Sequence, residues 1–377
     1  MDKSNIKICH LSSVHFALDT RIFYRMCNTL SKHYKVTLIA VHPQKEIKHN
    51  IQIIPFRRYH NRVFRVVFGW LIMFSKALKI NAKIYHLHDP ELIPCGLLLK
   101  LLGKKIIWDV HENIAEDIFD KPWLKNQKLA FSIFHFFEKK ACKYFYLLLA
   151  EKSYEKHYKD LTSNYSIILN YCDLTFFKKL EQKKYDQGKN LFYIGIILEN
   201  RGILQIIEAI HILNKQGEKF HFHCVGELYN DLYFKILNLP YYFEIKDQLH
   251  FYGRKSLENG YALAKNMNIG LCIIWPMSNS KESYPTKLFE YMAIGLPIIT
   301  SDFPLYKSVV EENKTGFCVN PFSATEIANA ILNIHRDAEK SKQMAEKGKT
   351  IVENKYNWNS EIPTLLNVYS QLLNITK

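Results

Sequence analysis

The sequence lacks the features that mark secreted and membrane-spanning proteins. Its first residues, Met1–Lys7, contain no apolar segment of the kind found in a signal peptide. Its longest strongly apolar run, Val66–Phe74, is far too short to cross a bilayer. The eight cysteines form no C-x-x-C pair, and several lie in apolar strand-like runs, which favours buried, reduced thiols. These absences predict a cytoplasmic protein.

Negative charge is scarce in the first half of the chain. The formal net charge is +15, and residues 1–175 hold 27 Lys and Arg against 15 Asp and Glu, whereas residues 176–377 hold 24 against 21. The basic half predicts an acidic partner: nucleic acid, an anionic membrane or an anionic acceptor. Because no recognisable nucleic-acid module is present, nucleic acid is not expected.

Two segments of the basic half combine apolar and aromatic residues with Lys and Arg: Arg62–Lys79 and Trp123–Lys143. A basic amphipathic helix can lie in the interface of an anionic membrane. The aromatic residues could equally belong to the core, with the basic residues solvated. Both alternatives remain open at the level of sequence, and peripheral membrane contact is one of them.

The chain of 377 residues is 48% hydrophobic and 23% charged, which suggests two globular domains, each able to bury its own core. No internal repeat or low-complexity tract is present. Near-continuous apolar runs alternate with helical patterns, which indicates parallel sheets covered on both faces. Ligands bind such sheets at the carboxyl ends of the strands. The expected strands are Ile6–Leu11, Val36–Val41, Ile51–Pro55, Ile84–Leu87, Lys105–Val110, Tyr146–Ala150, Ile167–Leu169, Leu191–Ile194, Phe220–Gly226, Leu249–Gly253, Ile269–Ile274, Ile298–Thr300 and Gly316–Val319.

The stretch Glu282–Pro297 combines a loop, a short helix, a sharp stop and a strand. Pro285 suits the first helical position, with Ser283 or Tyr284 as the cap. Gly295 suits the left-handed residue after the helix, which Pro297 prevents from continuing. Four apolar residues share one face and should pack on the sheet: Leu288, Phe289, Met292 and Ala293.

This helix would begin with free N–H groups and a positive dipole end, which is a seat for phosphate. Glu282 and Glu290 flank it, and Glu290 points away from the packed face. Because carboxylates repel phosphate, we expect them to accept hydrogen bonds from sugar hydroxyls. The combination suits a nucleotide diphosphate sugar. The alternative is that both glutamates are ordinary solvated residues.

Glu282-x7-Glu290 followed by Tyr-Met-Ala-x-Gly-x-Pro-Ile-Ile resembles the donor-site signature of retaining glycosyltransferases of family 4, and the resemblance extends over nearly the whole chain. It implies the α/β GT-B fold, with two Rossmann-like, doubly wound parallel-sheet domains facing a cleft. The expected domains are an acceptor-side domain (1–175), a polar linker (176–189), a donor-binding domain (190–355) and a helix that returns to the first domain (356–377).

The resemblance also implies a donor site. Its binding residues would be Glu290, Tyr284, Pro285, Thr286, Lys287, Gly195, Gly253 and Arg254. Glu282, His111 and Arg201 are the candidate catalytic residues: Glu282 and His111 would bind the transferred sugar, and Arg201 would stabilise the departing diphosphate. Family members carry a basic pair here, and Ile196 occupies its arginine position, whereas Arg201 replaces its lysine.

On the acceptor side, the polar loop after the first strand supplies His15, Asp19 and Arg21, and the fourth strand leads to His88 and Asp89. The family often has glycines in this first loop, and this chain has none. Asp19 could instead cap the following helix, with Arg21 on the surface. His86 and His88 fall on one side of their strand; a metal site is expected neither there nor elsewhere.

The resemblance implies a retaining, metal-independent transfer that needs no cofactor. A UDP- or GDP-sugar would be the co-substrate, and a glycan or lipid-linked molecule the acceptor. Bacterial cell-surface polysaccharide synthesis is the expected setting. The expected location is the cytoplasm, with peripheral contact at the inner face of the membrane as an open alternative. Two alternatives remain: a sugar-nucleotide epimerase of the GT-B type and a non-catalytic peripheral membrane scaffold.

Overall fold

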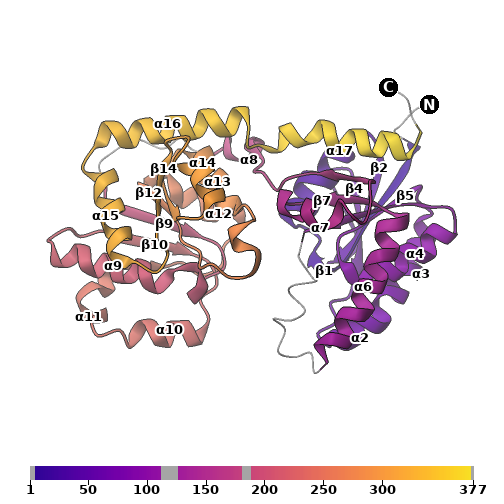
Figure 1. Cartoon of the computed structure of the whole chain (residues 1–377), viewed down its shortest axis with the longest axis horizontal. Coiled ribbons are helices and arrows are strands. Elements are labelled where there is room, and N and C mark those ends of the chain that lie inside the picture. The colour runs from indigo at the N-terminus through magenta and orange to yellow at the C-terminus, as the bar shows by residue number, and fades with distance from the viewer. Residues whose placement is uncertain (1–4, 112–125, 181–187, 375–377) are drawn as a thin grey trace. The chain divides into compact units, whose positions relative to one another are not determined.

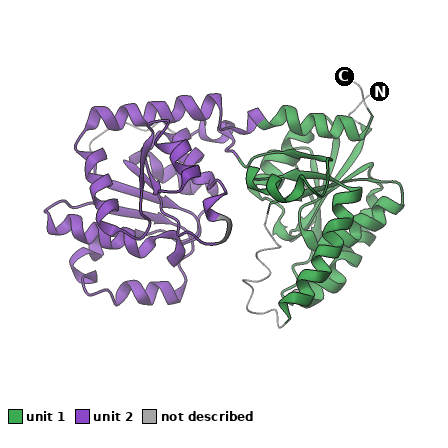
Figure 2. Ribbon diagram, in the orientation of Figure 1, with its two compact units in different colours: residues 1–170, 361–377 green, residues 171–360 purple. Residues whose placement is uncertain are grey.

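The computed structural model describes residues 5–111, 126–180 and 188–374 of the chain. Figure 2 shows two compact units: unit 1 comprises residues 1–170 and 361–377, and unit 2 comprises residues 171–360. Unit 2 therefore begins a few residues before the expected linker, and its helix α8 (Leu174–Phe177) reaches into the first residues of that linker. Residues 181–187 of the linker and residues 123–125 of the second basic segment lie outside the described residues.

Unit 1 is organised around an eight-stranded sheet in its described residues, with the strand order β3-β4-β2-β1-β5-β6-β7-β8. All neighbouring strands are parallel except the antiparallel pair β3 and β4. The edge strand β3 was not expected, because three partly exposed residues carry no apolar run. The strands are β1 (Lys7–Phe16), β2 (Lys35–Val41), β3 (Glu46–Lys48), β4 (Ile51–Phe56), β5 (Ile84–Leu87), β6 (Lys105–Val110), β7 (Tyr146–Leu149) and β8 (Tyr165–Ile167).

Helices cover both faces of this sheet. On one face α4 (Ile93–Leu101) packs between α3 (Trp70–Ile80) and α6 (Gln127–Tyr144), as Figure 1 shows. The other face meets the π-helical segment η2 (Thr20–Cys27) and α17 (Trp358–Leu372), which begins in unit 2 and belongs to unit 1 from Glu361 onward. The short segments are α1 (Asn28–Leu30), α2 (Arg62–Phe64), η3 (Arg65–Gly69, a π-helix), η4 (Pro90–Leu92), η5 (Lys152–Tyr154) and α7 (Glu155–Tyr158).

Unit 2 contains a six-stranded, wholly parallel sheet in the order β11-β10-β9-β12-β13-β14. Its strands are β9 (Asn190–Ile194), β10 (His221–Val225), β11 (Leu249–Phe251), β12 (Ile269–Cys272), β13 (Ile298–Ser301) and β14 (Gly316–Val319). Its main helices are α9 (Ile203–Lys215), α10 (Asn230–Leu237), α11 (Tyr242–Ile245), α12 (Leu257–Ala262), α13 (Thr286–Ile294), α14 (Pro304–Val310), α15 (Ala324–His335) and α16 (Ala338–Asn354). Four short 3-10 segments complete it: η6 (Glu199–Arg201), η7 (Lys246–Gln248), η8 (Leu263–Asn266) and η9 (Ser278–Lys281).

Both sheets are doubly wound, and this fixes where ligands can bind. In unit 1 the strand order reverses between β1 and β5, and in unit 2 it reverses between β9 and β12. A crevice forms outside the carboxyl ends of the strands at such a reversal, because the connections leave in opposite directions. The residues after β1, β5 and β6, and those after β9 and β12, therefore lie at the two edges where function is expected.

Candidate functional site

Helix α13 begins at the carboxyl edge of the unit 2 sheet. Its first residue is Thr286, and Pro285 is the N-cap, with an extended backbone (φ −69°, ψ 123°) and no side-chain capping bond. The expectation that Pro285 starts the helix was wrong by one residue. Proline offers no side-chain acceptor at the cap, and the dipole at this end of the helix favours an anion.

The end of α13 matches the sequence prediction. Gly295 takes the left-handed conformation (φ 72°), and its N–H and that of Leu296 bond back to the last helical turn. Leu288, Phe289 and Met292 are buried, as expected for the packed face, whereas Ala293 is only partly buried. Tyr291 is fully buried as well, and its hydroxyl donates to the Leu271 carbonyl of β12.

Lys287, in the first turn of α13, lies directly against the end of β9. A Cβ atom placed on Gly195 would be 2.7 Å from Lys287 Cε and 2.8 Å from Nζ. The ammonium group also lies 5.0 Å from the centroid of the Tyr193 ring. Burial lowers the pKa of Lys287, and the nearby Arg201 guanidinium lowers it further. Two cations thus gather at the point where the strand order reverses.

Arg201 reaches this edge on segment η6, which is tied to the loop after β12 by a hydrogen bond from Trp275 N to Asn200 O (2.9 Å). Among the described residues, neither Arg201 nor Lys287 forms an ion pair with a carboxylate. The position is therefore electropositive, and an anion placed there would receive hydrogen bonds from charged donors, which are the strong ones. Ile196, at the expected arginine position, exposes 59% of its surface.

Glycine backbone lines the ends of β9 and β10. Gly226 has φ 157°, and a Cβ atom on it would lie only 1.9 Å from the carbonyl oxygen of Gly195. Its N–H donates to the carbonyl of Gly253, which follows β11, at 3.0 Å. Arg254 is exposed just beyond. Glycine at these strand ends therefore lets neighbouring backbone segments approach each other closely.

Glu290 is buried inside unit 2 and is only 9% exposed. Its Oε2 accepts a hydrogen bond of 2.5 Å from the Tyr261 hydroxyl of α12. The alternative that Glu290 is an ordinary solvated residue is therefore wrong. Glu282, in the loop before α13, is exposed, and Tyr284 packs its ring against Phe289 at 5.6 Å.

The carboxyl edge of the unit 1 sheet brings together His15, Asp89 and His111. His15 was expected in a loop but lies in the last part of β1, whereas Asp89 follows β5 and His111 follows β6. His15 Nε2 lies 3.1 Å from His111 Nε2 and 3.4 Å from Asp89 Oδ1. His111 Nδ1 lies 3.3 Å from the Asp109 carbonyl oxygen, so the proton belongs on Nδ1 and Nε2 accepts. The three side chains therefore offer both donors and acceptors at the edge.

Asp89 is held in place by the loop that interrupts β1. Its Oδ2 accepts hydrogen bonds from Ser12 Oγ (2.9 Å) and from the Ser13 N–H (2.6 Å). Ser13 Oγ also donates to Glu91 Oε1 at 2.6 Å. Asp89 stands at the N-cap position of η4, but its side chain makes no capping hydrogen bond there. The two serines and Glu91 were not anticipated.

Two of the expected acceptor-side residues do not reach the edge. Arg21 and His88 are buried and both bind Asp109: Arg21 Nη2 donates to Oδ1 at 2.7 Å, and His88 Nδ1 lies 3.1 Å from Oδ2. Burial alone would raise the pKa of Asp109, but Arg21 and His88 outweigh it and hold that pKa well below its usual range. The alternative of a surface position for Arg21 is therefore wrong, and both side chains are bonded to Asp109, away from the exposed edge. Their role on the acceptor side stays a prediction.

Asp19 takes the capping role that the sequence left open. Its Oδ1 accepts hydrogen bonds from the N–H groups of Arg21 (2.8 Å) and Ile22 (2.9 Å), and so starts η2. This fixes the helix that carries Arg21 to Asp109. Its Oδ1 is thus engaged by the backbone, and a contact with the acceptor stays a prediction.

Comparison with known proteins finds a family model that matches unit 2. Residues 175–351 match the family model "Glycosyl transferases group 1". Alpha-D-kanosaminyltransferase of Streptomyces kanamyceticus is 23% identical over 51% of this chain and 48% of its own length. The capsular polysaccharide biosynthesis glycosyltransferase CapM of Staphylococcus aureus is 23% identical over 47% and 46%. The chain thus spans about half the length of the curated relatives it matches.

Solved structures match over nearly the whole chain. Sucrose-phosphate synthase of Thermosynechococcus elongatus superposes with a TM-score of 0.77 at 15% identity, covering 99% of this chain and all of that one. Anabaena Alr3699/HepE, in complex with UDP and glucose, gives 0.73 at 11% identity, covering 97% and 100%. The chain has the GT-B fold. Its two doubly wound sheets and the family match in unit 2 agree with that assignment.

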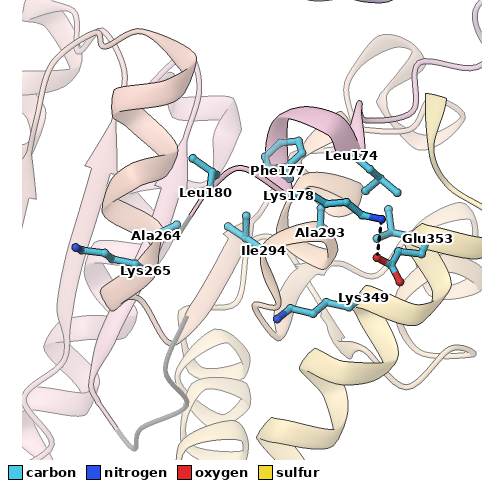
Figure 3. A pocket seen from close by; sticks show the side chains of 11 residues that line it. Leu174, Phe177, Lys178, Leu180, Ala264, Lys265, Ala293, Ile294, Lys349 and Glu353 are labelled. Atoms are coloured by element: carbon cyan, nitrogen blue, oxygen red, sulfur yellow. Dashed lines mark ion pairs between the residues drawn. The ribbon is translucent and has the colours of Figure 1, made fainter. Parts of the chain in front are cut away.

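In this GT-B chain, Figure 3 shows a pocket that is not the candidate donor site. Its walls come from α8, α13 and α16, and Lys178 forms an ion pair with Glu353 at its rim (3.3 Å). It touches Ala293 and Ile294, at the opposite end of α13 from Lys287. Its volume of about 130 Å³ is below the roughly 300–1,000 Å³ typical of ligand pockets.

Two groups of side chains have the composition of a metal site. His10, His86 and His88 form one group and His15, Asp89 and His111 the other, with the ligand atoms of each group within 4.8 Å of one another. The first group is fully buried and bonded to Tyr369, whose hydroxyl lies 2.8 Å from His86 Nδ1. His86 and His88 stack at 4.4 Å, which confirms that they share one side of the strand. The absence of a metal requirement stays a prediction.

Proposed function

We propose that the protein is a retaining glycosyltransferase that moves a sugar from a nucleotide-sugar donor to a glycan or lipid-linked acceptor. Unit 2 binds the donor and unit 1 binds the acceptor. The observation that carries the proposal is the contact between Lys287 and Gly195 at the start of α13, with Arg201 beside them. These groups form an anion-binding position where the strand order of the unit 2 sheet reverses.

This anion-binding position fits a diphosphate, and the Glu290 carboxylate fits a ribose. The α13 N–H groups and Lys287 bind the phosphate oxygens, and Arg201 stabilises the charge that develops as the diphosphate leaves. Glu290 binds the ribose hydroxyls through the oxygen that Tyr261 does not occupy. Glu282, Thr286, Gly253 and Arg254 lie around the same edge and complete the donor site.

Transfer requires no covalent intermediate with the protein in this proposal. The acceptor hydroxyl attacks the sugar carbon on the face from which the diphosphate departs, and the leaving phosphate takes the hydroxyl proton. Catalysis then depends on positioning and on charge stabilisation, and no metal ion is needed. His15, Asp89 and His111 bind hydroxyl groups at the unit 1 edge, and His111 also contacts the transferred sugar.

The donor nucleotide and the biological setting follow from the likenesses. A UDP-sugar is favoured because Alr3699/HepE was solved with UDP and glucose, and polysaccharide synthesis is favoured by the name of CapM. The test is calorimetric titration with UDP and GDP. We expect one of them to bind, and Arg201→Ala and Lys287→Ala to weaken it about tenfold to a hundredfold, since hydrogen bonds to charged groups contribute roughly 1.5–3 kcal/mol.

Matched controls separate a specific site from general basicity. Arg336→Ala, at the end of α15 on the opposite edge of the sheet, and Lys347→Ala, on the exposed side of α16, should bind the nucleotide normally. Glu282→Ala should bind it but release the diphosphate from the donor more slowly. Binding of neither nucleotide would reject the donor site and leave the scaffold alternative. Isomerisation of the donor without acceptor would identify an epimerase.

A further inference from the structure

Unit 1 exposes apolar side chains along the turn that leads into α3. The segment 63–71 surface consists of Val63, Phe64, Val66, Val67, Phe68 and Leu71, all exposed, from 39% for Phe64 to 65% for Val63. Gly69, Met73 and Ala77 are buried on the inner side of the same helical run. The core alternative is therefore wrong for the residues of this surface. An apolar outer face of this size on a helix calls for a partner.

Helix α6 carries a second outward apolar stripe. Leu129, Ile133 and Phe136 follow one another at helical spacing and are 56%, 52% and 56% exposed. Lys140 continues the stripe, with its ammonium group 5.5 Å from the centroid of the Phe136 ring. Lysine at the polar end of an apolar stripe is the arrangement of a helix that lies in a membrane interface.

The stretch of chain that carries the segment 63–71 surface has only positive charges. Residues 47–88 contain eight Lys and Arg and no Asp or Glu. Arg57, Arg58 and Lys79 are exposed, and Arg58 lies over the ring of Phe16, which is itself 50% exposed. A surface that is both apolar and basic fits a partner that is both apolar and anionic.

The two apolar surfaces lie at the edge of the sheet that holds His15, Asp89 and His111. Helices that connect parallel strands run back against the strand direction, so α3 and α6 both start at the carboxyl edge. Hydrogen bonds link the segment 63–71 surface to this edge. Arg65 Nε, on η3, donates to Glu91 Oε1 at 2.8 Å, and Ser13 Oγ donates to the same oxygen at 2.6 Å.

We propose that an anionic lipid bilayer docks on the segment 63–71 surface and the α6 stripe. Phe64, Phe68, Ile133 and their neighbours enter the interface, and the arginines and lysines contact the lipid phosphates. Nucleic acid would leave the exposed aliphatic side chains of Val63, Val67 and Leu71 without an apolar partner. A second copy of this chain would bring a second set of eight basic residues to the same contact, and the repulsion opposes it. In the described residues no helix is long and apolar enough to cross a bilayer, so contact is at the surface.

Docking in this way places the acceptor edge at the headgroups, and an acceptor attached to a lipid then reaches His15 and Asp89 without leaving the membrane. This part rests on the proposed function. Docking itself does not, because it is measured without donor or acceptor.

The experiment is co-sedimentation of the full chain with vesicles of phosphatidylcholine containing 30% phosphatidylglycerol. We expect binding at low salt, weaker binding at high salt and little binding to pure phosphatidylcholine. Val67→Ser/Phe68→Ser should reduce binding about tenfold. Arg57→Glu/Arg58→Glu should reduce it by at least roughly 25-fold, since each basic residue near the surface contributes about fivefold.

Two control variants match these changes elsewhere on unit 1. Leu101→Ser/Leu102→Ser alters exposed apolar residues at the end of α4, on the amino edge of the sheet. Lys35→Glu/Lys105→Glu reverses two exposed charges on that edge. Both should bind vesicles nearly as the parent does, and all variants should keep its thermal shift with nucleotide.

Failure to sediment at low salt would overturn the proposal, as would equal losses in test and control variants. Self-association that Val67→Ser/Phe68→Ser abolishes, with no vesicle binding, would assign the surface to a second copy instead.

Discussion

The end of the Lys287 side chain lies directly beside Gly195. A Cβ atom added to Gly195 would be 2.7 Å from Lys287 Cε and 2.8 Å from Nζ. Gly195→Ala should therefore displace Lys287 from the phosphate-binding position. It should also strain the backbone of residue 195, where φ is 137°. We expect a nucleoside diphosphate to bind about tenfold to a hundredfold more weakly, measured by calorimetry.

Gly217→Ala is the matched control for this prediction. Gly217 also has a positive φ (79°), but a Cβ atom there would meet nothing within 4 Å. It should cost about 1 kcal/mol or more of stability through backbone strain and leave nucleotide binding unchanged. Equal loss of binding in both variants would show that strain, and not the position of Lys287, explains the effect of Gly195→Ala.

The contribution of Glu290 to binding should be distinguishable from that of the phosphate-binding residues by comparing two ligands. Glu290→Gln removes the charge that would accept the ribose hydroxyls, so binding of a nucleoside diphosphate should weaken by about tenfold or more. Binding of inorganic pyrophosphate should hardly change, whereas Arg201→Ala should weaken both ligands. Tyr261→Phe tests whether the hydrogen bond to Oε2 orients the carboxylate, and should give a smaller loss with the nucleotide alone. A matching loss of pyrophosphate binding in Glu290→Gln would refute the ribose role.

The buried histidines of unit 1 should make its stability depend on pH below neutrality. Burial lowers the pKa of His10, His86 and His88 from 6.5, and Asp109, Arg21 and Tyr369 face them. The unfolded chain takes up protons as the pH falls through 6.5, and the folded chain does not. The free energy of unfolding should therefore fall below pH 6.5, by up to about 1.4 kcal/mol per pH unit for each histidine.

Urea denaturation at pH 7.5, 6.5 and 5.5, monitored by hydrogen exchange in unit 1 peptides, measures this slope. The variant His10→Gln/His86→Gln keeps a donor and an acceptor at each position but removes two of the three titrating groups. Its slope should be about one third of the parent slope. An unchanged slope would mean that groups other than these buried histidines set the acid sensitivity.

The sequence was sufficient for most of the strands, because fully buried parallel strands are uninterrupted apolar runs, and β5, β6 and β14 have the expected bounds. Strand β8, which is only partly buried, lies two residues before the expected Ile167–Leu169. It was also sufficient for Gly295, since only a glycine comfortably ends a helix in the left-handed conformation. It failed for β3, which has too few residues to show a period. It also missed the start of α13 by one residue, because proline suits both the cap and the first turn.

The interior contacts of the site could not be predicted. Arg21 and Asp109 are 88 positions apart, and local sequence says only that one follows a loop and the other ends a strand. Which of two charges turns inward depends on the partner that tertiary structure supplies. Glu290 is a similar case: its burial depends on the hydroxyl of Tyr261, 29 residues earlier, which no spacing rule connects to it.

Ile196 provides the last test, because it is the position at which this chain departs from the resembled family. Its side chain is 59% exposed, so an arginine fits without repacking the core. Its backbone is already fixed, since the Tyr193 hydroxyl donates to its carbonyl at 2.6 Å. Ile196→Arg should add a third cation to Lys287 and Arg201 and tighten nucleoside diphosphate binding at low salt by about fivefold to tenfold.

The charge-matched comparison is Leu198→Arg, two residues further along the same loop, where the side chain is 36% exposed. If general attraction between a more basic protein and a polyanion were the cause, both variants would tighten binding equally, and the gain would vanish at high salt. A gain confined to Ile196→Arg that partly survives high salt indicates a direct contact with the diphosphate. No gain in either variant would show that Lys287, Arg201 and the start of α13 already saturate the phosphate oxygens, so that the missing arginine costs this chain nothing.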